Sequence, residues 1–183
     1  MQTQILLTSF QTWLPHQRSN SSDDLLGAIE SQLFPNFSLG FLRQLPVDIE
    51  KSSRRAIAQI DRTHPNAILC CGMAETRNTL TIESTAWRGN KSLQTTLSLD
   101  SIVANLSATE ISHDAGKFVC EGLYYEVLNH IQQKQLPISC LFIHVPLLTS
   151  HNFFLISSDF CQLLDRVAKS HFSTKLQRDY TIS

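Results

Sequence analysis

The sequence of 183 residues lacks long hydrophobic runs and lacks an excess of charge of either sign. No apolar stretch approaches the roughly 20 residues that a membrane-spanning helix needs. The formal net charge is −1, because 15 basic side chains oppose 16 acidic ones. No global electrostatic attraction therefore draws the chain to nucleic acid or to an anionic membrane. We predict a protein that binds neither.

Secretion signals and paired cysteines are missing as well. Met1–Gln4 carries no positive charge, and the apolar stretch Ile5–Phe10 is too short for a signal peptide. The five cysteines are odd in number and contain no Cys-x-x-Cys spacing. A disulfide framework would pair all of them, and a zinc site would place ligands a few residues apart. We expect reduced thiols, no metal and a cytoplasmic location.

Hydrophobic residues make up 42% of the chain and charged residues 17%, which is typical of a folded globular protein. The length fits a single domain over residues 1–183. Short apolar runs alternate with longer segments of helical period. Strands are predicted at Ile5–Leu7, Phe41–Leu45, Ala67–Cys71, Leu80–Glu83 and Cys140–Val145.

Four helices are predicted between and after these strands. They run from Ser22 or Asp23 to about Leu33, from Asp48 to before Pro65, over Cys120–Ile131, and onward from Ser157 or Ser158 with Phe160, Leu163, Leu164 and Val167 inward. This alternation predicts an α/β fold with a largely parallel sheet covered on both faces. Such folds bind ligands at the carboxyl ends of their strands.

The segment Ser112–Cys120 is the most informative part of the sequence. Ala115 and Gly116 form a tight turn before an amphipathic helix, and Cys120 falls in its first turn. The positive end of the helix dipole lowers the pKa of a thiol in that position. The free backbone N–H groups there are suited to an oxyanion. The alternative is that Cys120 is a small residue on the core face, as most buried cysteines are.

A cysteine nucleophile needs a base and a group that orients it. His144 stands at the carboxyl end of the apolar strand Cys140–Val145, where α/β active sites lie, although a hydrogen-bonded core histidine is the alternative. Glu83 lies in the alternating stretch that begins at Leu80 and points to the face opposite Ile82. An exposed strand carboxylate is the alternative for Glu83. Spacing alone does not join these three residues.

Several motifs do join them, because they occur together and in order in one known family. The chain resembles the pyroglutamyl peptidase I family of cysteine peptidases, which remove an N-terminal pyroglutamate from peptides. The segments that carry the resemblance are Ser112–Cys120 followed by Tyr124-Tyr125, Phe142–Pro146, Gly72–Glu83, Leu45–Val47 and Leu7–Phe10. The resemblance extends from about Ile5 to the last predicted helix.

The resemblance implies a Cys-His-Glu triad, with Cys120 as nucleophile, His144 as general base and acid, and Glu83 orienting His144. It also implies a three-layer α/β/α sandwich, a cytoplasmic location, no metal or organic cofactor, and possible homo-oligomers. The expected substrate is a peptide with a blocked N-terminus or a small acyl amide. The remaining cysteines are expected to be packing residues.

The substrate pocket departs from the family pattern. The residues expected to bind the acyl group are Phe10, Trp13, Asn20, Gly72 and Met73. Phe10 and Trp13 offer aromatic faces for a flat lactam ring, and Met73 stands where the family has glutamine.

Other departures lie around the pocket. The step Leu14-Pro15, like Glu75-Thr76, replaces a pair of glycines, and Glu121 replaces a neutral asparagine beside the nucleophile. The spacer between Glu83 and the cysteine motif is short, with room for one helix around Ser101–Leu106.

The leading hypothesis is a cysteine exopeptidase for pyroglutamyl or similar cyclic acyl groups. The alternative is a catalytically silent relative that binds a small acyl or peptide ligand. A thiol redox protein is a third hypothesis, weakened because no resolving cysteine is close in sequence.

Overall fold

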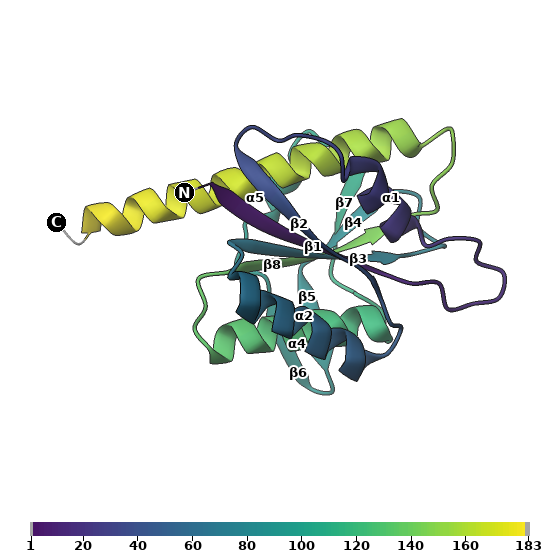
Figure 1. Ribbon diagram of the computed structural model, residues 1–183, viewed down its shortest axis with the longest axis horizontal. Helices are drawn as coiled ribbons and strands as arrows, with labels where there is room; N and C mark the ends of the chain where they lie inside the picture. The colour runs from purple at the N-terminus through teal and green to yellow at the C-terminus, as the bar shows by residue number, and fades with distance from the viewer. Residues whose placement is uncertain (1, 182–183) are drawn as a thin grey trace.

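The computed structural model describes the backbone of residues 2–181 and the side chains of residues 2–171. Strands and helices alternate along the chain (Figure 1), except over residues 67–94, where four strands follow one another. The strands are β1 (Thr3–Phe10), β2 (Phe37–Leu45), β3 (Ala67–Met73), β4 (Leu80–Glu83), β5 (Thr85–Arg88), β6 (Lys91–Gln94), β7 (Thr109–Ser112) and β8 (Ser139–Val145). The helices are α1 (Ser21–Ile29), α2 (Ile49–Thr63), α3 (Leu99–Val103), α4 (Val119–Gln133) and α5 (Phe153–Thr181).

Six of the strands form one sheet in the order β2-β1-β3-β8-β4-β7. The first four strands in this order are parallel, whereas β4 runs antiparallel to β8 and parallel to β7. Strands β5 and β6 form a separate two-stranded hairpin. The sheet is therefore mostly parallel, and both the α/β fold class and this feature of it are confirmed.

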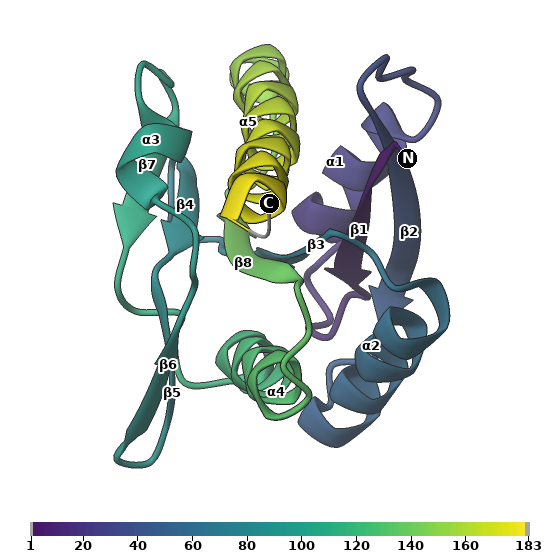
Figure 2. The ribbon, with the colours of Figure 1, turned by 90° about the vertical axis from the view of Figure 1, so that its left-hand side faces the viewer.

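Helices cover both faces of the sheet (Figure 2), which gives the predicted three layers. Helices α1, α3 and α5 pack on one face, where the core includes Leu26, Ile102 and Phe160. Helices α2 and α4 pack on the other, where it includes Ile60 and Leu123. Burial on both faces explains why the central strands are continuous apolar runs in the sequence.

All five predicted strands and four predicted helices are present, but some boundaries were wrong. Helix α1 ends at Ile29 and not near Leu33, whose side chain is 97% exposed and gains nothing from a helical position. Helix α5 begins at Phe153, before Ser157, because the amides of Phe153 and Ile156 already bond to Thr149 and Asn152 carbonyls. Its four predicted inward residues are fully buried.

The largest correction concerns the stretch between Glu83 and Cys120. It holds the β5–β6 hairpin and strand β7 besides the expected short helix, which lies at Leu99–Val103. Strand β7 is only four residues long, and helix α5 holds it in place. Asp159 of α5 accepts hydrogen bonds from the Ala108 amide at 2.7 Å and the Thr109 hydroxyl at 2.9 Å. Such a contact is invisible in local periodicity. Within residues 2–181, no helix is long and apolar enough to cross a bilayer.

Candidate active site

The three residues expected to form the triad meet on one face of the sheet. Glu83 and His144 point to this face from their strands, and Cys120 reaches it from α4. In β4, Ile82 belongs to the core beneath α5, so its neighbour Glu83 points toward α4. In β8, Ile143 likewise faces α5 and His144 faces α4. Helix α4, which carries Cys120, packs on that face. Strand periodicity thus directs Glu83 and His144 toward the helix that bears the thiol.

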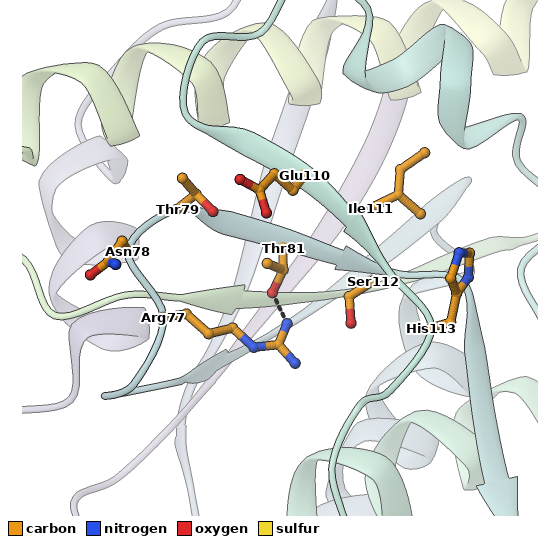
Figure 3. A pocket seen from close by; sticks show the side chains of 8 residues that line it. All are labelled: Arg77, Asn78, Thr79, Thr81, Glu110, Ile111, Ser112 and His113. Atoms are coloured by element: carbon orange, nitrogen blue, oxygen red, sulfur yellow. Dashed lines mark hydrogen bonds between the residues drawn. The ribbon is translucent and has the colours of Figure 1, made fainter.

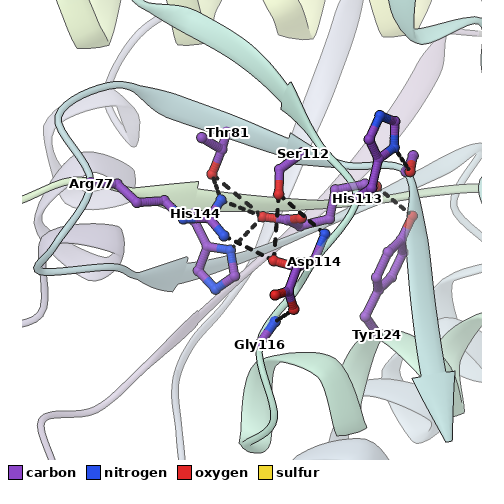
Figure 4. Close-up of polar contacts among 10 residues, drawn as sticks. Arg77, Thr81, Ser112, His113, Asp114, Gly116, Tyr124 and His144 are labelled. Carbon is purple, nitrogen blue, oxygen red and sulfur yellow. Dashed lines mark hydrogen bonds and ion pairs between the residues drawn. The ribbon is translucent and has the colours of Figure 1, made fainter.

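Glu83 and His144 are hydrogen-bonded to each other in the interior. Glu83 is fully buried, so the alternative of an exposed carboxylate is wrong. Its Oε1 atom lies 2.8 Å from Nδ1 of His144, whose ring is labelled in Figure 4. An ionised carboxylate only accepts hydrogen bonds, so Nδ1 carries the proton and Nε2 is left as an acceptor. The Tyr124 hydroxyl, on α4, donates to the Glu83 carbonyl at 3.0 Å and ties the helix to β4.

Arg77 shares the same carboxylate oxygen. Its Nη1 donates to Glu83 Oε1 at 2.5 Å and to the hydroxyl of Thr81, and its Nη2 donates to the Asp114 carbonyl at 2.9 Å. Burial by itself raises the pKa of Glu83. Hydrogen bonds from His144 and Ser112, with the positive charge of Arg77 and of His144 when protonated, outweigh it, so the pKa lies below the ordinary 4.5. Glu83 is therefore a carboxylate at neutral pH.

Cys120 lies against the strand next to His144. A Cβ atom on Gly72 would stand 2.7 Å from Cys120 Sγ, so only glycine leaves room for the sulfur. Gly72 of β3 is the register partner of His144 in β8. The thiol and the imidazole therefore flank one position of the sheet. Among the described side chains, no hydrogen bond links Cys120 to His144, as is common for catalytic pairs without substrate.

The expected low pKa of the Cys120 thiol is wrong for this state. Burial is the main cause that raises its pKa to about 12, and the neighbouring Cys70 and Glu83 add to the increase. The positive charge of Arg77 acts in the opposite direction but is weaker. The helix position alone therefore does not generate a thiolate, because the sulfur is enclosed. A proton acceptor such as His144 is needed.

Trp13 and Phe118 form an aromatic pair at the start of α4, the helix that carries Cys120. Their ring centroids are 4.9 Å apart, and each residue is about half exposed, at 53% and 50%. Phe118 is the residue before α4, two positions from Cys120, and caps the helix without a side-chain hydrogen bond. Trp13 is thus the predicted binding residue with an accessible ring. Phe118 was not among the predicted binding residues, although it belongs to the cysteine motif.

Side-chain hydrogen bonds hold the loop that carries Trp13. Gln17 Oε1 accepts from the amides of Trp13 and Leu14 at 3.0 and 3.1 Å. Gln17 Nε2 donates to Glu75 Oε1 at 2.5 Å, and His16 Nε2 lies 3.0 Å from Glu75 Oε2. Glu75 follows β3, so it ties the loop to the strand that ends at Met73. Sequence reasoning noted Glu75 only as a replaced glycine.

The other predicted binding residues are more enclosed. Phe10 is 2% exposed and packs in the core beneath α4. Asn20 is the N-cap of α1: its side chain accepts from the Ser22 amide at 3.0 Å and donates to the Gln11 carbonyl at 3.3 Å. Met73 Sδ lies 3.3 Å from the Ser21 amide. The side-chain oxygen of Asn20 is therefore already occupied in capping α1.

Glu121, the acidic residue beside the nucleophile, is turned toward the hairpin. Its Oε1 accepts from the Trp87 amide at 3.2 Å, and burial raises the pKa of its carboxyl group.

At the β7 edge of the sheet, a cavity of about 440 Å³ lies on β4 and β7 (Figure 3). Its lining residues are Arg77, Asn78, Thr79, Thr81, Glu110, Ile111, Ser112 and His113.

The sequence is similar to proteins of one family. A family model described as pyroglutamyl peptidase matches residues 89–156. A pyrrolidone-carboxylate peptidase of Brevibacillus brevis is 31% identical over an alignment of 149 residues, and the match covers 67% of this chain and 67% of that protein. Another from Bacillus cereus is 27% identical over an alignment of 132 residues, and the match covers 58% of this chain and 61% of that protein. Parts of both relatives therefore have no counterpart in the alignments.

Solved structures of the same family share the fold. The pyroglutamyl peptidase I of Bacillus amyloliquefaciens has a TM-score of 0.81 at 21% identity, covering 92% of this chain and 96% of that one. The pyrrolidone carboxyl peptidase of Thermococcus litoralis has a TM-score of 0.80 at 16% identity, covering 94% and 96%. At such low identity, these likenesses concern the arrangement of helices and strands.

Proposed function

The chain belongs to the pyroglutamyl peptidase family, and we propose that it is a cysteine exopeptidase that hydrolyses the amide after an N-terminal pyroglutamyl or similar cyclic acyl group. The observation that carries this proposal is the buried contact of 2.8 Å between Glu83 and His144, one strand away from the sulfur of Cys120. A carboxylate, an imidazole and a thiol in that order form the chain of groups that nucleophilic acyl transfer requires.

In the proposed mechanism, His144 Nε2 takes the proton of Cys120 as the sulfur attacks the substrate carbonyl. The carbonyl oxygen becomes an oxyanion, and the unpaired amides at the start of α4 stabilise it. Glu83 stabilises the protonated imidazole. His144 then gives the proton to the departing amine, the C–N bond breaks, and an acyl thioester remains on Cys120. Water, deprotonated by His144, hydrolyses the thioester and restores the thiol.

The high pKa of the free thiol is compatible with this sequence of steps. With a pKa of about 12, Cys120 is protonated at neutral pH. Proton transfer must accompany attack, or a bound substrate must first exclude water and bring the two groups together. In the proposal, the exposed ring of Trp13 and the ring of Phe118 contact the flat acyl group, and backbone at Gly72 and Met73 supplies polar contacts.

Cleavage of a pyroglutamyl reporter amide by the purified protein tests the proposal. We expect measurable hydrolysis that is abolished by Cys120→Ala, with an unchanged melting temperature. Cys161→Ala is the matched control, because this half-exposed thiol lies on α5 in another part of the fold, and it should keep full activity. Full activity in Cys120→Ala would contradict the proposed nucleophile.

A catalytically silent ligand-binding protein is the second candidate. The raised pKa of Cys120 favours it, because little nucleophilic thiolate is present at neutral pH. The burial of Phe10 also favours it, because a substrate has little access to that ring. It predicts that wild type and Cys120→Ala bind pyroglutamyl peptides with equal affinity and that neither turns them over. A cytoplasmic location, a single domain over residues 1–183 and a homo-oligomeric state remain predictions.

A further inference from the structure

One row of residues crosses four strands of the sheet through His144. The register pairs Gly72 of β3 with His144 of β8, His144 with Thr81 of β4, and Thr81 with Glu110 of β7. Cross-strand partners point to the same face, so the four positions share the face covered by α4. Cys120 Sγ lies at the Gly72 end of this row. Glu110 stands at the other end.

The cavity on β4 and β7 occupies the Glu110 end. Thr81, the register partner of His144, lines it together with Glu110 (Figure 3). The predicted acyl-binding residues, such as Trp13 and Met73, lie on the opposite side of β8 with β1 and β3. A substrate whose acyl group lies over β3 therefore extends its leaving group past His144 toward β4 and β7.

One charged group that lines the cavity has no partner among the described side chains. The charge of Arg77 is compensated by the Glu83 carboxylate, and its guanidinium also donates to the Thr81 hydroxyl and the Asp114 carbonyl. His113 Nδ1 lies 2.6 Å from the Ser84 hydroxyl. Glu110 is exposed and makes no hydrogen bond or ion pair within the described side chains. Asn78, Thr79 and Ser112 add uncharged polar groups, so Glu110 is the charged lining group without a partner among the described side chains.

We propose that this cavity receives the side chain of the residue that follows the acyl group, and that Glu110 selects a cationic side chain there. The inference rests on the proposed function. Two strand spacings of about 4.8 Å place Glu110 about 10 Å from His144. The long stems of lysine and arginine span such a gap from a leaving nitrogen held at His144. A glutamate side chain at that position of the substrate is repelled.

Three peptides that differ only in the residue after pyroglutamate, with lysine, alanine or glutamate there, test the inference. Product release measured by chromatography should give kcat/KM in the order lysine, alanine, glutamate, with about three- to fivefold between steps. The difference should appear mainly in KM and shrink at high salt. Glu110→Gln should level the three values, and Glu110→Lys should reverse their order. Glu50→Gln, an exposed carboxylate on α2, is the matched control and should leave the order unchanged.

Equal kcat/KM for the three peptides, or a lysine preference that survives Glu110→Gln, would overturn the inference while leaving the proposed activity intact. If none is cleaved, the proposed function fails, and calorimetric titration of Cys120→Ala still decides the inference. Tighter binding of the lysine peptide that disappears when Glu110→Gln is added supports the subsite. Equal binding of the three peptides, or binding of none, contradicts it.

Discussion

The proposed catalytic residues and the proposed acyl-binding residues are held in different ways. Glu83 and His144 stand on neighbouring strands, are buried, and are fixed by the register of the sheet. Trp13 stands on a loop, is half exposed, and depends on the side chains of Gln17 and Glu75. Side chains on a packed sheet keep their positions when surface residues are substituted, whereas the conformation of a loop held by a few polar contacts changes readily. Chemistry and specificity are therefore expected to respond differently to mutation.

The sharpest test of the strand-borne region is the loss of His144. His144→Ala should lower kcat by about 10²- to 10⁴-fold with a small change in KM, because proton transfer is lost while the acyl pocket is kept. Glu83→Gln should cost less, since it keeps the side-chain shape but weakens support for the charged imidazole. Steady-state kinetics on a pyroglutamyl amide measure both. Equal and negligible effects would remove the two residues from the mechanism.

Gly72→Ala tests the close approach of the sulfur to β3. The new Cβ would stand 2.7 Å from Cys120 Sγ and 3.0 Å from the Phe142 ring, so the thiol must move. We expect kcat to fall about 100-fold from this displacement, with a loss of about 1–3 kcal/mol in the free energy of unfolding. Gly40→Ala on β2 is the matched control, because its nearest neighbour is 3.8 Å away. Similar kinetics for the two variants would contradict the described contact.

The pH dependence of alkylation tests the raised pKa of Cys120. Only the thiolate reacts, and a thiol pKa of about 12 keeps its fraction small at neutral pH. The rate of iodoacetamide labelling at Cys120, followed by peptide mapping, should therefore rise about tenfold per pH unit between pH 6 and 9. Glu83→Gln should accelerate it, because the charge of Glu83 raises that pKa. A plateau near neutral pH would instead indicate a preformed thiolate–imidazolium pair.

The smallest expected effect concerns the loop. Glu75→Ala removes the carboxylate that holds Gln17 and His16, so the Trp13 loop loosens. We expect KM to rise about three- to tenfold with kcat nearly constant, the size of one or two lost hydrogen bonds. In a Trp87→Phe background, Trp13 fluorescence reports the loop directly, and acrylamide should quench it more strongly in the variant.

Two results would decide against this account of the loop. Unchanged quenching in Glu75→Ala would mean that the contact does not position Trp13. A large fall in kcat with constant KM would mean that Glu75 acts on the chemistry and not on the loop. Glu75→Gln keeps hydrogen-bonding atoms at the same position and should recover part of the lost affinity. Glu50→Ala, on α2, controls for the loss of an exposed carboxylate.

The local pattern of the sequence was sufficient to predict the strands that helices cover on both faces of the sheet. Strand β3 and strand β8 read as apolar runs because helices cover them on both sides. Strand β7 and the β5–β6 hairpin were missed, since each strand is four residues long and partly exposed. What stabilises β7 is Asp159, 50 residues later in the chain. No local window contains both partners.

For the site, the sequence determined which groups are present and which face of each strand they occupy. Period-two alternation directs Glu83 and His144 away from the core residues beside them. Tertiary structure decided that both are buried and paired, that Arg77 shares the carboxylate, and that enclosure raises the pKa of Cys120 above what its helix position suggests. The physical reason is that a local motif fixes a direction along one strand or helix. Distance, desolvation and charge depend on every element packed around it.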